Sequence, residues 1–457
     1  MKRLRVLLPV HVFFPTHFYG TETYTLELAK SLTKLGHEPV ILTATPYGEK
    51  GAGTLHSTYE YDELTVHCID LNLKPHSRFK DTYYRPDLYP ILEEIITRIK
   101  PDIAHVTHLI NHSSSLLEVL RDARIPAIAT LTDFFGICFN NKLERYDATL
   151  CEGPDKRSTN CLCCYVRKVE AFSKHPFWGP LISNDVFLRM ISRMLPLGIT
   201  VPGFRKGAVA GHVLDVTRRI NTLRYLYSAY RYLVAPTDFL FEAYASNSFY
   251  PERLRKINFG INLALVKDYQ RPRRKPGSGV RFGYIGQLTS HKGADLLIRA
   301  FLRLKGDNKS LVLYGPQDQD PAYMQGLFSL ASGDQGIEFR GTFPQRELPR
   351  RLSEIDVLVI PSRWYENSPL VLLYSLAAKT PVIATDVKGM SEFVRHGFNG
   401  FTFAMNSVEH LAETMQHIID EPGMIERLSD NAVYANDVLD HTNEVCKLYD
   451  AAIYGKE

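Results

Sequence analysis

Lys292 lies in a glycine-bounded segment, GQLTSHKG at 286–293, between an apolar run typical of a buried strand and a stretch with helical periodicity. Backbone N–H groups ahead of a helix bind anions, and glycines let a ligand approach the backbone closely. We therefore expect this segment to bind a phosphate group, with Lys292 supplying a fixed positive charge. The alternative is an ordinary loop with a solvated lysine.

A carboxylate, Glu366, stands after another predicted strand and just ahead of a helix expected over about 369–378. It can accept hydrogen bonds from the hydroxyl groups of a ligand, and Asn367, Ser368 and Pro369 offer further contacts beside it. The alternative is a helix cap, because negative charge at a helix start is worth about 0.3–1 kcal/mol. We favour the ligand-binding interpretation.

The N-terminal half offers further candidates at the ends of predicted strands, where α/β sheets bind ligands. His105 and His108 occur in DIAHVTH, and Asp133 occurs in TLTDFF. Gly20 precedes a helix and permits a close approach to its backbone. Of the two histidines we choose His108. A single histidine is more often structural, so both interpretations stay open for His108 and for Asp133.

Five of the seven cysteines fall between positions 138 and 164. The run CEGPDKRSTNCLCC contains Gly, Pro and polar residues and predicts a loop rather than a helix or strand. Four thiolates in one loop suit a tetrahedral zinc ion, and an iron–sulfur cluster uses the same ligands. We expect a structural zinc ion or iron–sulfur cluster on Cys138, Cys151, Cys161 and Cys164. The alternative is a set of free cysteines.

The elements that position these residues alternate between strand and helix in both halves. Apolar runs predict buried strands at 5–10, 40–44, 103–106 and 127–131, and again at 280–285, 310–314, 357–360, 381–384 and 400–403. Helices are expected at 294–304 and, without interruption, over about 424–454. This alternation predicts an α/β protein with parallel sheets covered by helices on both faces.

Length and composition restrict the class of protein. With 457 residues the chain exceeds what one hydrophobic core usually supports, so we expect two domains. A hydrophobic fraction of 45%, 23% charged residues and a net charge of +4 are those of a globular protein and do not indicate a nucleic-acid partner. The opening MKRLRVLLPV is too short for a signal peptide, and no run of apolar residues is long enough for a membrane span. A cytoplasmic location is expected.

Three segments together resemble the retaining glycosyltransferase family 4. They are GTETYTLELAKSLTKLGHEPVILTA from Gly20, IGQLTSHKG from Ile285, and PSRWYENSPLVLLYSLAAKTPVIATDVKGMSEFVRHGFNG from Pro361. The resemblance covers nearly the whole chain and keeps the family's order. It implies the GT-B fold, in which two Rossmann-like domains face each other across an interdomain cleft. We expect these domains at 1–266 and 280–435, a linker at 267–279, and a final helix, 436–457, that returns to the first domain.

The resemblance implies transfer of a sugar from a nucleotide donor, most simply a UDP-sugar, with retention of configuration and no cofactor required for catalysis. The family places a basic residue on the diphosphate at the position of Lys292, and Glu366 is the first of its paired glutamates. His108 would contact the sugar. The catalytic set would comprise Glu366, Lys292, His108 and Asp133. The donor-binding set would comprise Gly20, Gly286, Gln287, Lys292, Gly315, Arg340, Asn367, Ser368, Pro369, Leu370 and Tyr374.

Four positions depart from the family pattern. Tyr374 replaces the second glutamate, Gln287 an arginine, Tyr19 a glycine and Thr132 a histidine. Each missing charge-assisted hydrogen bond costs about 1.5–3 kcal/mol of binding. One alternative is therefore a degenerate homologue that binds nucleotide sugar or glycan without turnover. Another is a different GT-B enzyme, such as an epimerase or a phosphorylase.

The stretch 165–232 mixes Lys and Arg with bulky apolar residues. Such a surface can rest on anionic lipid while the protein reaches a lipid-linked acceptor. The resemblance implies a glycan or lipid-linked acceptor, in polysaccharide or glycoconjugate biosynthesis, and we expect peripheral contact at the inner face of the membrane. The alternative is a set of amphipathic helices packed on the N-terminal domain with solvated basic faces.

Overall fold

The computed structural model describes residues 2–168, 178–198, 208–267, 269, 271, 278–421 and 423–455. Two compact units are present, Met1–Ile257 with Thr442–Glu457, and Asn258–His441. Residues 258–266, expected in the first domain, belong to the second unit, because the carbonyl groups of Asn258 and Phe259 accept hydrogen bonds from Asn436. In the expected linker, residues 268, 270 and 272–277 lie outside the described part of the chain.

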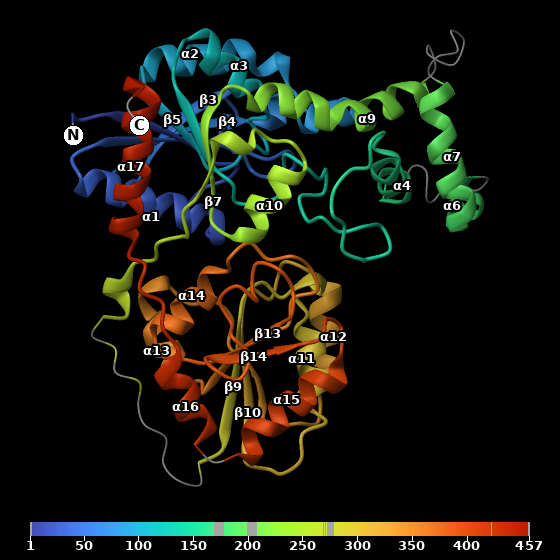
Figure 1. The fold of residues 1–457 in the computed structure, drawn as a ribbon, viewed down its shortest axis with the longest axis vertical. Helices are drawn as coiled ribbons and strands as arrows, with labels where there is room; N and C mark the ends of the chain where they lie inside the picture. The colour runs from blue at the N-terminus through green and yellow to red at the C-terminus, as the bar shows by residue number, and fades with distance from the viewer. Residues whose placement is uncertain are drawn as a thin grey trace. The chain divides into compact units, whose positions relative to one another are not determined.

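An eight-stranded sheet forms the centre of the first unit, in the order β3-β4-β2-β1-β5-β6-β7-β8 (Figure 1). All neighbours pair in parallel except β3 with β4. The central strands β1, β5 and β6 are mostly apolar and, apart from Arg5, buried, because helices cover both faces of the sheet. The strand bounds are β1 Arg5–Pro9, β2 Glu38–Thr45, β3 His56–Tyr61, β4 Leu64–Asp70, β5 Ile103–Val106, β6 Ala127–Thr130, β7 Tyr230–Ala235 and β8 Leu254–Lys256.

The helices of the first unit include a group that extends from the sheet: α4, α6 and α7 lie near the far part of the long helix α9 (Figure 1). The last helix, α17, packs on the first unit, where the Tyr449 hydroxyl lies 2.7 Å from His105 Nδ1. The bounds are α1 Gly20–Lys34, α2 Tyr89–Ile99, α3 Ser115–Asp122, α4 Thr159–Lys168, α6 Trp178–Ser183, α7 Asp185–Gly198, α9 Ala208–Tyr227, α10 Asp238–Ser246 and α17 Val438–Tyr454.

The predicted cysteine loop is wrong in its second half, because Cys161, Cys163 and Cys164 lie on helix α4. Asp155 explains the helix start. Its carboxylate accepts hydrogen bonds from the backbone N–H groups of Thr159 and Asn160 at 2.9 and 3.1 Å, and so satisfies donors that have no partner within the helix.

The second unit contains a six-stranded parallel sheet in the order β11-β10-β9-β12-β13-β14 (Figure 1). Starting from β9, the chain first adds β10 and β11 on one edge and then adds β12, β13 and β14 on the opposite edge of β9. The same reversal occurs in the first unit between β1 and β5. Open α/β sheets bind ligands at the carboxyl ends of the strands at such a reversal. The strand bounds are β9 Val280–Ile285, β10 Lys309–Tyr314, β11 Ile337–Phe339, β12 Val357–Ile360, β13 Val382–Thr385 and β14 Gly400–Phe403.

The helices around the second sheet are α11 Ala294–Phe301, α12 Pro321–Ala331, α13 Leu348–Ser353, α14 Leu370–Ala377, α15 Val408–Asp420 and α16 Met424–Asn431. The prediction of one continuous helix over 424–454 is wrong, because α16 ends at Asn431 and α17 begins at Val438. The intervening backbone bonds to Ile261 instead, whose N–H donates to Asn436 O at 3.1 Å. Among the described helices, none combines the length and the apolar character needed to cross a bilayer.

Candidate functional site

Two loops of the second unit bring Lys292 and Glu366 together. The first loop follows β9 and the second follows β12, and these strands are neighbours in the sheet. Lys292 Nζ donates to Glu366 Oε1 at 2.6 Å. Residues that are 74 positions apart in sequence therefore form one ion pair at the carboxyl edge of the sheet, where it reverses.

The carboxylate of Glu366 is held by more than the lysine. Ser362 Oγ and Trp364 Nε1 also donate to Oε1, at 2.6 and 2.7 Å, and the Glu366 side chain is 8% exposed. Lys292 Nζ lies 4.8 Å from the centre of the Trp364 ring, which adds a cation–π contact. Burial alone would raise the pKa of Glu366, but the charge of Lys292 and the three hydrogen bonds outweigh it, so the pKa is lowered. Glu366 is therefore a carboxylate at neutral pH.

Arg363 fixes the two loops to each other. Its guanidinium donates two hydrogen bonds to Asp295, at 2.6 and 2.8 Å, and a third to Ser290 O at 2.8 Å. Bidentate pairs of this kind impose a defined geometry. The sequence reasoning missed Arg363, Ser362 and Trp364, although all three belong to the same SRWYEN segment as Glu366.

Two glycines allow backbone segments to pack closely against the loop that carries Glu366. A Cβ on Gly293 would lie 2.0 Å from Pro361 O, and one on Gly389 would lie 1.7 Å from Glu366 O. Both also have positive φ, +75° and +89°, which side chains disfavour. Gly315 has a similar packing role, because its Cβ would lie 2.1 Å from the carbonyl oxygen of Gly286.

Ser368 is the most unusual residue of the second loop. Its backbone is left-handed, with φ of 54°, and its buried Oγ has no hydrogen-bond partner. An unpaired buried hydroxyl costs about 1–3 kcal/mol, and strained, unsatisfied groups concentrate at functional sites. Pro369 caps helix α14, and Leu370 is its first residue. Asn367 lies between Glu366 and Ser368 in this loop.

The side chains of two predicted donor-binding residues, Arg340 and Tyr374, and the backbone carbonyl of a third, Gln287, already bond within the second unit. Arg340 pairs with Glu338 and Glu354, at 2.7 and 2.8 Å. The buried hydroxyl of Tyr374 accepts the N–H of Asn262 at 3.1 Å and lies 3.3 Å from Gln345 Nε2. The Gln287 carbonyl accepts from the Tyr284 hydroxyl at 2.6 Å. Tyr374 therefore has a hydrogen-bonding role inside the fold.

The first unit joins His108 to Asp133 at the ends of the adjacent strands β5 and β6. His108 Nδ1 accepts the N–H of Ile110 at 3.0 Å, which leaves Nε2 protonated to donate to Asp133 Oδ2 at 2.8 Å. The N–H of Phe135 donates to the other Asp133 oxygen at 2.8 Å. His105 is different, because it is fully buried and both of its ring nitrogens contact hydroxyl groups of the core.

His11 and Glu22 extend this group, and the sequence reasoning missed both. The His11 ring lies 4.3 Å from the His108 ring, and His11 Nε2 lies 3.2 Å from Glu22 Oε1. Burial raises the pKa of Glu22 and lowers that of His11 well below its usual value, so the imidazole is neutral. Their remaining polar atoms, His11 Nδ1 and Glu22 Oε2, have no partner. A signal was present, since His11 follows the first strand and Glu22 falls in the first turn of α1.

A small cavity lies beside His108 and Asp133. A cavity of about 20 Å³ lined by His108 and Asp133 is large enough for a water molecule only. At the start of α1, no atom lies within 4 Å of the point where a Cβ on Gly20 would be placed. Gly20 therefore faces open space, in which a ligand could approach the backbone.

The predicted metal ligands gather in the first unit, and Cys138, Cys151 and Cys164 are buried there. Within the described ranges, no group of three or more His, Cys, Asp or Glu side chains is spaced to hold a metal ion as it stands. The four-cysteine ligand set therefore stays a prediction.

Comparison with known proteins places this geometry in a family. Residues 18–148 match glycosyltransferase family 4, and residues 267–433 match glycosyl transferases group 1. The D-inositol 3-phosphate glycosyltransferase of Rhodococcus jostii is 32% identical over 196 residues, 40% of this chain and 43% of that protein. The chain thus matches less than half the length of this relative.

Solved structures support the same assignment at the level of the fold. A glycosyltransferase from Rickettsia africae aligns over 100% of both chains with a TM-score of 0.64 and 14% identity. HepE of Anabaena, solved with UDP and glucose, aligns over 98% of this chain and 100% of its own with a TM-score of 0.62 and 14% identity. The two doubly wound sheets have the GT-B fold, and the chain belongs to glycosyltransferase family 4.

Proposed function

We propose that this protein is a retaining glycosyltransferase that moves a sugar from a nucleotide donor, a UDP-sugar, to a glycan or lipid-linked acceptor. The observation that supports this most is the Lys292–Glu366 pair at the reversal of the second sheet. It places a cation suited to a diphosphate beside a carboxylate suited to sugar hydroxyls. The structure of HepE with UDP and glucose supports the choice of donor.

In the proposed reaction, Lys292 opposes the charge that develops on the departing diphosphate. Glu366 accepts hydrogen bonds from the sugar hydroxyls and so orients the ring. The bond from the anomeric carbon to the diphosphate oxygen breaks, and the acceptor oxygen bonds to the same face of that carbon. The acceptor proton passes to the leaving phosphate, so no separate protein base is needed.

Other residues would complete the donor site. The unpaired hydroxyl of Ser368 gains a partner when a phosphate or sugar oxygen lies beside it. Backbone N–H groups within 287–291 and that of Leu370, at the start of α14, would supply further donors. In the first unit, His108 would contact the sugar, and Asp133 would hold its imidazole in the protonated-Nε2 form.

A second candidate is a homologue that binds nucleotide sugar without turnover. The observation that favours it is Tyr374, which puts no carboxylate at the position of the family's second glutamate and whose hydroxyl bonds the N–H of Asn262. Release of UDP from UDP-sugars in the presence of acceptor candidates separates the two functions. The transferase predicts acceptor-dependent release that Lys292→Ala and His108→Ala abolish. Binding of UDP without release by the intact protein would favour the second candidate.

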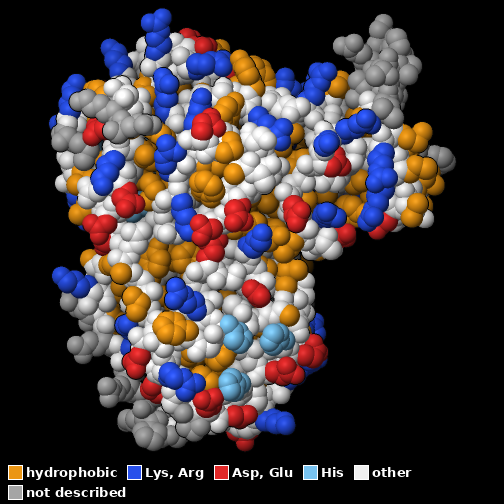
Figure 2. All heavy atoms as spheres, in the orientation of Figure 1, with side chains coloured by type: hydrophobic (Ala, Val, Ile, Leu, Met, Phe, Trp, Pro, Cys, Tyr) orange, Lys and Arg blue, Asp and Glu red, His pale blue; other side chains and the backbone are white. Residues whose placement is uncertain are grey.

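We further propose that the protein contacts the inner face of the membrane through α7. Val186, Met190 and Met194 recur every four residues on this helix and are 78%, 50% and 59% exposed. Arg189 and Arg193, also exposed, flank this stripe. Figure 2 shows hydrophobic and basic side chains mixed over the extended part of the first unit. A stripe of this kind lies in the interface of an anionic bilayer, which would bring a lipid-linked acceptor close to the enzyme.

A further inference from the structure

The four cysteines that the sequence groups together form a cluster in the folded first unit. Cys138 and Cys151 flank a short hairpin, in which Glu144 and Leu150 form a bridge and the N–H of Cys151 donates to Leu143 O at 2.7 Å. Cys161 and Cys164 lie three residues apart on α4, so they share one face of that helix. Every pair among the four thiols is close enough to interact electrostatically.

The fifth cysteine of the segment, Cys163, points elsewhere. Its Sγ lies 3.9 Å from Leu188 O, on α7, and it packs with Ile182 and Leu188. The fold therefore divides the five cysteines of the segment into four that interact electrostatically with one another and one that belongs to a neighbouring apolar core.

The sulfurs have polar neighbours in the hairpin. The N–H of Gly153 donates to Cys151 Sγ at 3.4 Å. The Cys138 thiol donates to Asn140 Oδ1 at 2.8 Å, and the Cys151 thiol lies 3.5 Å from Gly153 O. An N–H donor such as that of Gly153 stabilises sulfur in its thiolate form, and a bound metal ion keeps thiols deprotonated.

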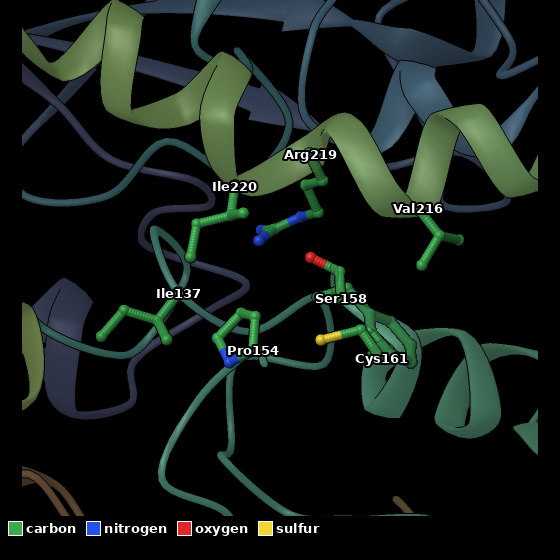
Figure 3. A pocket seen from close by; sticks show the side chains of 8 residues that line it. Ile137, Pro154, Ser158, Cys161, Val216, Arg219 and Ile220 are labelled. Carbon is green, nitrogen blue, oxygen red and sulfur yellow. The ribbon is translucent and has the colours of Figure 1, made fainter. Parts of the chain in front are cut away.

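A buried positive charge faces the same cluster. Arg219, on α9, is 4% exposed and points with Cys161 into a small cavity of about 10 Å³ (Figure 3). One guanidinium nitrogen donates to Phe135 O, while Nε and Nη1 have no hydrogen-bond partner. No described carboxylate forms an ion pair with Arg219. The rings of Tyr83 and Phe135 lie 5.7 and 5.2 Å from its guanidinium carbon and compensate the charge only in part.

A buried charge without a counter-charge is strongly unfavourable. Four neutral thiols would leave Arg219 uncompensated. Four thiolates on a divalent cation carry two net negative charges, so a metal site would supply the missing counter-charge. The negative charge of a metal–thiolate cluster would thus be compensated by Arg219, and the positive charge of Arg219 by the cluster.

We propose that Cys138, Cys151, Cys161 and Cys164 bind a structural zinc ion that ties the 138–151 hairpin to α4 beside Arg219. Four thiols release four protons as the ion binds. The sulfurs are not spaced for an ion as they stand, so they must turn toward a common point at about 2.3 Å from the zinc. An all-cysteine set of tetrahedral ligands selects zinc or an iron–sulfur cluster, and the site has no open position for catalysis.

The site would also support the first unit's functional group. Cys138 is five residues after Asp133, and between them Phe135 bonds both to Asp133 and to Arg219. A zinc ion at Cys138 would hold this segment in place and so keep Asp133 on His108.

The test is the metal content of the intact, full-length protein, purified without added metal or chelator and measured by plasma mass spectrometry. We expect about one zinc per chain, and reconstitution with Co²⁺ should give the intense thiolate-to-cobalt absorption of a tetrahedral site. Cys161→Ser should lose the metal, whereas the matched Cys163→Ser should keep it. The Arg219→Met protein should release zinc to a chelator at least about tenfold faster than the Arg219→Lys protein, because only lysine keeps the positive charge beside the thiolates.

Three results would overturn the zinc assignment, and none requires a variant to fold. Zinc below about a tenth of an equivalent, with all 7 cysteines titrating as free thiols in denaturant, would leave a cluster of ordinary thiols. A deficit of free thiols without metal would show disulfides. Iron with visible sulfide-to-iron absorption would replace zinc with an iron–sulfur cluster.

Discussion

Lys292 Nζ lies 2.6 Å from Glu366 Oε1, so the cation and the carboxylate of the proposed donor site form an ion pair with each other when no ligand is bound. A diphosphate and a sugar would each compete for one member of this pair. Ligand binding must therefore exchange one strong contact for others, and the two side chains should respond differently to substitution.

Glu366→Gln should separate sugar orientation from nucleotide binding. The amide keeps the shape of the side chain but loses its charge, so Lys292 becomes free to bind phosphate fully. We expect kcat/KM for the UDP-sugar to fall by about 10²–10³, while the affinity for UDP is unchanged or increases. Steady-state kinetics and calorimetry measure the two quantities. Glu413→Gln, which neutralises an exposed carboxylate on α15, is the matched control. If Glu366→Gln lost UDP affinity by as large a factor as it lost kcat/KM, the assignment would be contradicted.

The Lys292–Glu366 pair should make the unfolding free energy depend on pH in the acidic range. The folded pKa of Glu366 lies below its ordinary value of 4.5, so the carboxylate stabilises the fold at neutral pH. This contribution is lost as the pH falls from about 4.5 through the lower, folded pKa. Urea unfolding at stepwise lower pH should therefore show a steeper loss of unfolding free energy in the wild type than in Glu366→Gln. Parallel curves for the two proteins below that pH would refute the pairing.

Tyr374→Phe tests whether the tyrosine that replaces the family's second glutamate contacts the nucleotide. Its hydroxyl bonds Asn262 and Gln345, so we expect a loss of about 0.5–1.5 kcal/mol in unfolding free energy and no change in UDP affinity. Tyr434→Phe, whose hydroxyl bonds Phe259 O, should behave in the same way and serves as the control. A tenfold or greater loss of UDP affinity in Tyr374→Phe alone, about 1.4 kcal/mol, would place the hydroxyl on the ribose instead.

The membrane contact predicts a loss of vesicle binding when α7 becomes polar. Val186, Met190 and Met194 are exposed, so replacing all three with Gln should leave the unfolding free energy nearly unchanged. Binding to vesicles that contain anionic phosphatidylglycerol should fall at least about tenfold in a sedimentation assay. Phe328→Gln, on the exposed side of α12, should bind like the wild type. Equal binding of the triple variant and the wild type would exclude α7 as the contact.

Much of the fold could be predicted because its central strands are continuous apolar runs. The predicted strands at 280–285, 357–360 and 400–403 agree with β9, β12 and β14 residue for residue. The hairpin of β3 and β4 was missed because β3, HSTYEY, is polar and half-exposed at the edge of the sheet. Its strand character comes from pairing with β4, which the local sequence does not reveal.

The candidate site could be predicted only in part, because single motifs do not show which side chains meet. The sequence marks Lys292 and Glu366 as separate candidates, and the sheet order brings them together. The supporting contacts from Trp364 and Ser362 depend on loop conformation, which no periodicity encodes. The break at 432–437 had the same origin, since the helical pattern continues while the backbone there bonds to Ile261.

The most direct test of the central claim is calorimetric titration of the purified protein with UDP, repeated with GDP and ADP. Lys292→Ala is compared with Lys305→Ala, an exposed lysine whose removal changes the net charge of the same unit equally. The donor-site assignment predicts selective binding of UDP that weakens at least about tenfold in Lys292→Ala and not in Lys305→Ala. Binding of none of the three nucleotides by the wild type, or equal binding by both variants, would contradict it.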